Sequence, residues 1–294
     1  MEDKLLRGKP VADALTDDII DKVRRLNDQG IFPKLAMLKV GNKADDASYQ
    51  KGATSRCAKC GIETQVVELD EDCSQDEYLA ALEGLNKDES VHGILCFRPL
   101  PAHIDEEIVK YYIDDRKDVD CFSPLSLAKI ISGDKRGFAP CTPMGVIEIL
   151  KYYNVDLKGK NVTVLGRSMV VGKPLSMLLL NRDSTVTICH SRSKDLENIV
   201  KGSDILVSCM GRAKAVDKSF IKEGAVVIDV GINFDNDGNM CGDVDTDDVL
   251  DRVSHITPVP GGVGSVTSSI LARHTLRACI PVSYTHLRAH ETVL

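Results

Sequence analysis

The chain lacks tryptophan altogether, and aromatic residues make up only 4% of its 294 residues. No apolar run approaches the roughly 18–20 residues that a membrane-spanning helix needs. There is no basic tract either, since 37 Lys and Arg stand against 44 Asp and Glu, which argues against binding to nucleic-acid phosphates. The charged start, Met-Glu-Asp-Lys, is unlike an export signal. We therefore expect a cytoplasmic protein that binds neither membranes nor nucleic acid.

What the chain does contain is an ordinary globular balance, with 43% hydrophobic and 28% charged residues. This balance argues against a disordered or fibrous protein, and the length fits about two domains of ~150 residues. The ten cysteines are scattered, and we expect them to be reduced thiols. Only Cys57 and Cys60 form a tight pair, which has no second pair or nearby His to complete a zinc site. We predict no metal.

Apolar periodicity predicts alternating strands and helices along the whole chain. Helical spacing covers residues 11–26, 46–60, 78–85 and 266–279, and further helical segments begin near Lys173, Asp195 and Asp217. Strand-like runs cover 35–40, 64–69, 91–96, 162–165, 185–189, 205–208 and 226–230. This βαβ rhythm predicts an α/β fold with mostly parallel sheets. The Pro- and Gly-marked stretch 123–143 is the candidate domain junction.

The most informative segment is 161–174, Asn-Val-Thr-Val-Leu-Gly-Arg-Ser-Met-Val-Val-Gly-Lys-Pro. A buried strand ends at Gly166, and a second glycine, Gly172, opens a helix, so that backbone N–H groups and the helix dipole can face a phosphate. The spacing is not the common G-x-G-x-x-G, nor is it a P-loop, because Pro174 stands where a P-loop has Ser or Thr. The segment predicts a dinucleotide site, with an ordinary glycine-bearing turn as the alternative.

The next predicted strand runs into Cys-His-Ser-Arg-Ser at 189–193. In a Rossmann-type domain the end of the second strand faces the adenosine ribose, where a carboxylate favours NAD and arginine with hydroxyls suits the 2′-phosphate of NADP. Ser191 and Arg192 occupy this position without a competing carboxylate. The pattern favours NADP over NAD, with a solvated polar loop as the alternative.

The acidic run 235–239, Asp-Asn-Asp-Gly-Asn, has some likeness to a calcium loop. Its glycine comes too early for an EF-hand, and no glutamate closes the loop. A hairpin turn at Asp237 and Gly238 is the better interpretation.

Seven motifs in order resemble the methylenetetrahydrofolate dehydrogenase/cyclohydrolase family, and the resemblance covers about residues 3–280. The first four are Lys117-Asp-Val-Asp120, Pro140-Cys-Thr-Pro-Met-Gly145, Val164-Leu-Gly-Arg-Ser168 with Val171-Gly-Lys-Pro174, and Cys189-His-Ser191. The others are Ala225-Val-Val-Ile-Asp-Val-Gly-Ile-Asn233, Gly242-Asp-Val-Asp245 and Thr257-Pro-Val-Pro-Gly-Gly-Val-Gly264.

The resemblance implies two domains around a cleft: an N-terminal α/β catalytic domain that binds folate, and a Rossmann-type domain that binds NAD(P). We place the first at residues 1–142 plus a returning helix at 269–280, and the second at 143–268. The family oxidises methylenetetrahydrofolate to methenyltetrahydrofolate and then hydrolyses it to formyltetrahydrofolate, within the one-carbon metabolism that serves purine biosynthesis. The resemblance also implies a homodimer.

The resemblance further implies roles for individual residues. Asp120 matches the family's pterin-binding aspartate, and one carboxylate can accept two adjacent donors of a reduced pterin together. Implied catalytic positions are Tyr49 and Asp120. Implied folate-binding positions are Tyr49, Cys96, Phe97, Arg98, Asp120, Pro260, Gly261, Gly262, Val263 and Gly264. Implied cofactor positions are Gly166, Arg167, Ser168, Gly172, Ser191, Arg192 and Ile232.

Two departures from the family pattern fall on polar positions that act together. The family has a catalytic lysine four residues after the tyrosine, on the same helix face, but here Ala53 follows Tyr49 at that spacing. A glutamine of the strand-end motif is replaced by Phe97, which forms no side-chain hydrogen bond. Ser265 and Val266 replace the family's Pro-Met, which is a milder change.

These departures favour a methylenetetrahydrofolate dehydrogenase whose cyclohydrolase activity is weak or lost. A fully bifunctional enzyme that uses the positive charge of Arg56 or Arg98 is the alternative, and a non-catalytic folate- and nucleotide-binding protein is the third hypothesis. The tail at 281–294 matches nothing in the family and resembles read-through of a cloning adapter, so it is excluded from fold and site reasoning.

Overall fold

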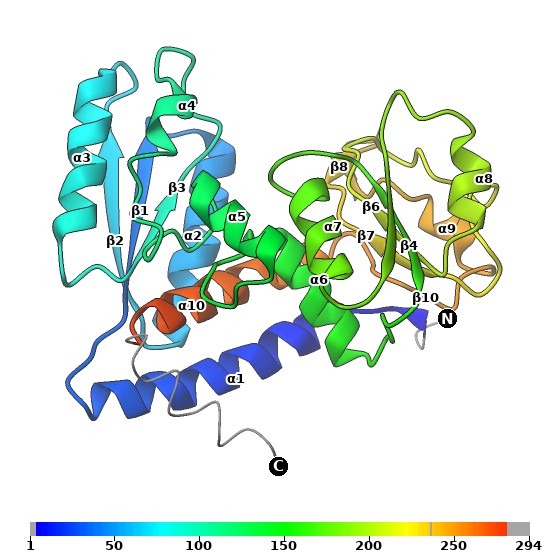
Figure 1. Ribbon diagram of the computed structural model, residues 1–294, viewed down its shortest axis with the longest axis horizontal. Helices are drawn as coiled ribbons and strands as arrows, with labels where there is room; N and C mark the ends of the chain where they lie inside the picture. The colour runs from blue at the N-terminus through cyan, green and yellow to red at the C-terminus, as the bar shows by residue number, and fades with distance from the viewer. Residues whose placement is uncertain (1–3, 236, 281–294) are drawn as a thin grey trace. The chain divides into compact units, whose positions relative to one another are not determined.

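The computed structural model describes residues 4–235 and 237–280 (Figure 1). The chain divides into two compact units, which we name by their sheets. The three-strand unit comprises Ala14–Lys129, Lys135–Ala139 and the segment that begins at Ser268; the five-strand unit comprises Ile130–Asp134, Pro140–Thr267 and the segment that ends at Asp13. The predicted domain boundary between 142 and 143 lies close to Pro140, and as a functional boundary it stays a prediction. The tail at 281–294 lies outside the described residues.

The three-strand unit contains a parallel sheet in the order β2-β1-β3. Its strands are β1 (Lys34–Val40), β2 (Glu63–Leu69) and β3 (Gly93–Cys96). Its helices are α1 (Gly8–Asn27), α2 (Ala44–Lys59), α3 (Gln75–Lys87), α4 (Glu106–Val109), α5 (Pro124–Ser132) and α10 (Thr267–Ala278), of which α1, α5 and α10 run on across a unit boundary. The predicted elements in this part of the chain are confirmed in type and within a few residues in extent.

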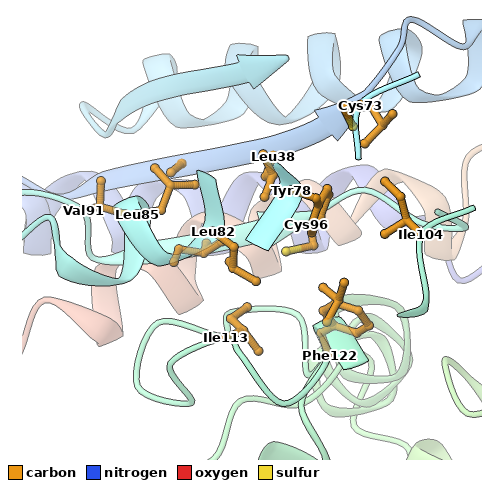
Figure 2. Close-up of a cluster of buried hydrophobic side chains, with 14 residues drawn as sticks. Leu38, Cys73, Tyr78, Leu82, Leu85, Val91, Cys96, Ile104, Ile113 and Phe122 are labelled. Atoms are coloured by element: carbon orange, nitrogen blue, oxygen red, sulfur yellow. The ribbon is translucent and has the colours of Figure 1, made fainter. Parts of the chain in front are cut away.

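Strand alternation divides this unit into two packed faces. The side chains of Ala36, Leu38 and Val40 point to one face of β1, where they join a buried cluster with Tyr78 and Leu82 of α3 (Figure 2). Helix α3 begins at a capping box, in which the Ser74 hydroxyl and the Glu77 carboxylate each bond the other's backbone N–H. Because side chains alternate along a strand, Lys39 points to the other face of the sheet. Phe97, one residue beyond the end of β3, points to that face as well.

The five-strand unit has a parallel sheet in the order β10-β7-β6-β4-β5. The strands are β4 (Asn161–Leu165), β5 (Thr185–Cys189), β6 (Ile205–Ser208), β7 (Val226–Asp229) and β10 (His255–Ile256). The helices are α6 (Cys141–Tyr152), α7 (Gly172–Leu180), α8 (Leu196–Lys201), α9 (Thr246–Val249) and the 3-10 turn η2 (Val263–Ser265). Strand order reverses at β4, because the chain goes to β5 on one side and then to β6 on the other. Such a reversal places ligands at the carboxyl end of the central strand.

One predicted helix in this unit is wrong. The segment that starts at Asp217 forms turns instead, with backbone bonds such as Phe220 N–H to the Asp217 carbonyl. Its neighbour Val216 is paired with Val244 as a short bridge, and Gly224 has a φ of +77°. These constraints interrupt the helical pattern on both sides. The predicted hairpin turn at 237–238 is confirmed, because β8 (Asn233–Phe234) and β9 (Met240–Cys241) pair antiparallel around it.

Candidate active site

The turn after β4 has no room for side chains at its two glycines. Gly166 has a φ of +127°, and a Cβ there would lie 2.5 Å from the Cys209 carbonyl oxygen. A Cβ on Gly172 would lie 2.2 Å from the Gly166 carbonyl oxygen. The Ser168 hydroxyl oxygen accepts the Val171 N–H at 3.1 Å. The first turn of α7 thus packs directly onto the strand end, which is the backbone approach that a dinucleotide phosphate requires.

The predicted ribose-side residues lie at the end of the neighbouring strand β5, which pairs with β4. The Ser193 hydroxyl accepts the His190 N–H at 2.9 Å, and the Arg192 N–H donates to His190 Nδ1 at 3.2 Å. Ser191 and Arg192 are exposed, as are Arg167 and Ser168 in the β4 turn. The fold therefore brings these two predicted groups to the same edge of one sheet.

A buried carboxylate organises the loop after β6, on the other side of β4. Asp243 is fully buried and accepts hydrogen bonds from Ser208 Oγ (3.0 Å), Met210 N–H (2.6 Å), Arg212 N–H (2.9 Å) and Asn233 Nδ2 (3.0 Å). The predicted cofactor residue Ile232, next to Asn233, is 62% exposed. Sequence analysis did not assign a role to Asp243, although its motif was one of the seven that carried the family resemblance.

A second buried carboxylate, Asp229, supports the first. It accepts the backbone N–H groups of Gly231, Asp243 and Val244 at 2.8–3.0 Å. Burial raises the pKa of Asp229 to about 6, and the charge of Asp243 adds to the rise, whereas the three backbone bonds act against it. The pair fastens the β8–β9 hairpin to the carboxyl edge of the sheet.

The glycine loop at 260–264 divides into exposed and buried positions. Pro260, Gly261 and Gly264 are exposed, whereas Gly262 and Val263 are buried. A Cβ on Gly262 would lie 2.4 Å from the Pro258 carbonyl oxygen. Gly262 therefore serves packing within its own unit, and Pro260, Gly261 and Gly264 are the positions of this loop that solvent reaches.

In the three-strand unit, the end of β3 gathers the predicted folate residues. The rings of Tyr49, on α2, and Phe97 meet edge to face with centroids 6.0 Å apart. The Arg98 guanidinium lies 4.6 Å from the centre of the Phe122 ring and 3.7 Å from Glu106. Phe97 is buried, and Tyr49 and Arg98 are half-buried.

Asp120 belongs to the same cluster. Burial raises the pKa of the Cys96 thiol to about 12, and the charges of Asp118, Arg98 and Asp120 also act on that thiol. Asp120 is half-buried, and the neighbouring Cys121 has a φ of +58°. The structure thus places Tyr49 against Phe97, and Cys96 near Arg98 and Asp120, at the end of β3.

The substituted position Ala53 is completely buried on the helix face that carries Tyr49. Arg56, three residues after Ala53, donates from Nη1 to the Thr16 hydroxyl at 2.7 Å. Lys51 is exposed and lines a different surface, described next.

A polar cavity of about 570 Å³ lies between α2 and the strands β1 and β2. Its lining includes Lys39, whose side chain is only 3% exposed and whose Nζ lies 2.8 Å from Glu68 and 3.3 Å from Asn42 Oδ1. Sequence analysis passed over Lys39. A lysine within an otherwise apolar strand was the available signal.

Within residues 4–235 and 237–280, no group of three or more His, Cys, Asp or Glu side chains is placed to hold a metal ion. Among the helices of the same residues, none combines the length and the apolar character needed to cross a membrane.

A parallel sheet that carries a side-chain-free glycine turn at its central strand, with hydroxyls and an arginine at the next strand, defines a Rossmann-type dinucleotide-binding enzyme. Sequence models of two domains match this chain: the tetrahydrofolate dehydrogenase/cyclohydrolase catalytic domain at residues 6–120, and the NAD(P)-binding domain of the same family at 140–281. The chain belongs to the tetrahydrofolate dehydrogenase/cyclohydrolase family.

Relatives and solved structures agree with this assignment. The bifunctional protein FolD of Clostridioides difficile is 60% identical over 276 residues, which cover 94% of this chain and 96% of the relative. The crystal structure of the bifunctional dehydrogenase/cyclohydrolase FolD of Campylobacter jejuni matches with a TM-score of 0.91 and 39% identity, over 94% and 98% of the two chains. The Trypanosoma brucei FolD, solved with NADP and an inhibitor, matches with a TM-score of 0.88 and 35% identity, over 97% and 98%. The two-domain α/β fold and the NAD(P)-dependent enzyme class are thereby confirmed.

Proposed function

We propose that this enzyme oxidises methylenetetrahydrofolate to methenyltetrahydrofolate with NADP, and that its cyclohydrolase activity is weak or lost. The observation that carries the proposal is the pair of buried apolar side chains, Ala53 and Phe97, at the two positions where the family pattern has lysine and glutamine. The sequence retains the dinucleotide turn and the folate-side residues Tyr49 and Asp120.

Hydride transfer depends mainly on holding two flat rings at contact distance. NADP, when bound, supplies the nicotinamide ring that accepts the hydride. The backbone at Gly166 and Gly172 is suited to the pyrophosphate, and Ser191 with Arg192 is suited to the 2′-phosphate. On the folate side, the Asp120 carboxylate can accept pterin N–H groups, and the half-buried Tyr49 offers an aromatic face. None of these tasks needs a group that titrates near neutral pH.

Hydrolysis of the methenyl bridge makes a different demand. Water attacks the bridging carbon, and a proton must then be moved as the ring opens, to which a positioned acid–base group typically contributes ~10²–10⁴-fold. Neither Ala53 nor Phe97 has an atom that can donate or accept that proton. Of the two arginines, Arg56 is bonded to Thr16 and Arg98 lies against Phe122 and near Glu106, so both have partners of their own.

The bifunctional alternative also has support. The C. difficile relative, at 60% identity, is named a bifunctional protein. In that case a guanidinium, which keeps its proton at working pH, would act by its charge rather than by proton exchange.

An absorbance assay that follows formation and decay of methenyltetrahydrofolate separately distinguishes the two proposals. With NADP supplied, we expect methenyltetrahydrofolate to accumulate and to decay no faster than in enzyme-free buffer. Decay at an enzyme-like rate would establish the bifunctional alternative, and Arg56→Gln and Arg98→Gln would then identify the cation that is used. A homodimer and a cytoplasmic location stay predictions, which sedimentation and cell fractionation can check.

A further inference from the structure

Asp118 lies two residues before the proposed pterin ligand, and its carboxylate holds the turn that follows that ligand. Its side chain is 1% exposed. One carboxylate oxygen accepts the Phe122 N–H at 2.8 Å and the other accepts the Ser123 N–H at 2.8 Å. The chain from 118 to 123 therefore folds back on Asp118, and Asp120 is part of this bend.

The bend contains a conformation that needs such support. Cys121 has a φ of +58°, in the left-handed region that residues with a Cβ adopt at a cost in conformational energy. The two bonds to Asp118 close the chain around this residue. We infer that they stabilise the conformation in which Asp120 is presented.

The chain on the other side of Asp120 is also held. The Lys117 carbonyl accepts the Ile94 N–H of β3 at 2.7 Å, and the Val119 carbonyl bonds Nδ1 of the buried His274 at 2.9 Å. The backbone before Asp120 is thus attached to β3 and α10, and the turn after Asp120 is attached to Asp118.

The same turn also contacts the guanidinium of Arg98. Phe122, whose N–H is bonded to Asp118, has the Arg98 guanidinium 4.6 Å from the centre of its ring. The charges of Asp118, Asp120 and Arg98 all act on the Cys121 thiol at the centre of this loop. One buried carboxylate is thus connected to both an anionic and a cationic side chain at the strand end.

We propose that Asp118 is a positioning residue for folate: by holding the amides of Phe122 and Ser123, it directs Asp120 toward the pterin. This inference rests on the proposed function. It assigns to the molecule a group that acts on the substrate through its neighbours and does not touch it.

A double-mutant cycle tests the proposal in the full-length enzyme. Asp118→Asn keeps the shape of the side chain, but its amide NH₂ faces a backbone N–H where an oxygen accepted before. We expect kcat/KM for methylenetetrahydrofolate to fall on the order of tenfold or more, since a misplacement of about 1 Å can cost ~10²-fold, with the Kd for NADP unchanged. Asp120→Asn should lower kcat/KM at least as much. The double variant should be no worse than Asp120→Asn alone, because Asp118 acts through Asp120.

Two further variants separate positioning from folding. Asp88→Asn is the matched control, since Asp88 also accepts a backbone N–H, from Ser90 at 2.9 Å in the same unit, and its loss should leave folate kinetics unchanged. Cys121→Gly added to Asp118→Asn should restore part of the folate kcat/KM, because glycine adopts the left-handed conformation without a Cβ penalty. If Asp118→Asn alone does not fold, the folate kcat/KM is measured in the double variant Asp118→Asn with Cys121→Gly.

The outcomes distinguish the inference from the function on which it rests. If Asp120→Asn impairs folate turnover but the double variant loses the product of the two single effects, Asp118 acts independently and the inference is wrong. If Asp120→Asn has normal kinetics, both the proposed pterin ligand and its positioning by Asp118 are wrong. Loss of NADP affinity in Asp118→Asn equal to the loss in folate turnover would show a general folding defect and overturn the inference.

Discussion

Arg192 shows how one side chain can decide between two cofactors. It stands at the end of β5 with Ser191, exposed and beside the glycine turn of the paired strand β4. A guanidinium binds a phosphate through parallel hydrogen bonds, whereas the 2′-hydroxyl of NAD offers no charge. We therefore predict that this residue sets the preference for NADP over NAD.

We expect Arg192→Asp to weaken NADP binding far more than NAD binding, by about 10-fold or more in the ratio of the two KM values, because a repulsive contact replaces a charge-assisted one. Steady-state kinetics with each cofactor measure the ratio. Lys201→Asp, the same charge reversal on α8 of the same unit, is the matched control. Equal losses for both cofactors in Arg192→Asp would sink the assignment of the 2′-phosphate.

For single residues, the sequence reveals a role where a motif implies it. It does not reveal a role that depends on hydrogen-bond partners elsewhere in the fold. Asp120 and Gly166 were recognised from motifs. Asp118, Asp243 and Lys39 were passed over, because each bonds groups that lie far along the chain or several residues on, such as Arg212 for Asp243. The sequence alone does not show whether an aspartate is exposed to water or accepts hydrogen bonds from four donors.

Helix α10 carries a buried titratable group, His274, which makes the stability of the protein depend on pH. His274 lies 2% exposed, with one ring nitrogen bonded to the Val119 carbonyl and its ring 5.4 Å from Phe138. Burial lowers the pKa of His274 well below its ordinary value, and the positive charges of Arg277 and Arg273 lower it further, against the effect of the Val119 bond. The folded protein therefore holds this histidine neutral where the unfolded chain would protonate it.

The buried, neutral His274 lowers the stability of the folded protein in acid. Below about pH 6.5 the unfolded state binds a proton that the folded state does not, so stability falls as pH falls. In His274→Asn the side-chain amide can still donate to Val119 but does not titrate. Between about pH 7.5 and pH 5 we expect the wild type to lose more unfolding free energy than this variant, by at most about 2 kcal/mol. Urea unfolding at both pH values measures the difference; parallel losses would contradict the assignment.

Other elements show why periodicity succeeded in most places and failed in one. The strands β4, β5 and β6 are short apolar or β-branched runs bounded by turn residues, and their predicted bounds agree within one residue with the observed ones. The segment from Asp217 has helical spacing too, but Val216 pairs with Val244 some thirty residues away. A tertiary bridge of this kind overrides a local preference that is weak on its own.

For the whole molecule, the decisive question is whether dehydrogenase activity is kept while cyclohydrolase activity is lost. Ala53 is completely buried and Phe97 is 7% exposed, so both substituted positions are enclosed by protein. A lysine introduced alone at position 53 would lack the polar partner that the glutamine provides, because the Phe97 side chain forms no hydrogen bond. Both positions must therefore change together.

We expect Ala53→Lys with Phe97→Gln to recover part of the ~10²–10⁴-fold that an acid–base group contributes to hydrolysis, with dehydrogenase turnover largely kept. The decay of methenyltetrahydrofolate after NADP is exhausted measures it. Ala53→Met with Phe97→Gln is the matched control, because methionine has a similar length without a proton to exchange. Equal decay in the two double variants would show that lysine chemistry is not what the enzyme lacks.

The amino-acid sequence by itself determined the α/β class, the order of strands and helices, the dinucleotide turn and the two substituted positions, because these depend on local spacing and on residue identity at motif positions. Only the tertiary structure decided that Gly262 is packed against its own unit while Gly264 is exposed, that Arg56 is bonded to Thr16, and that Asp118 holds the turn beside Asp120. The physical reason is that a hydrogen bond or a steric contact joins atoms that are close in space, and the distance along the chain does not say which atoms those will be.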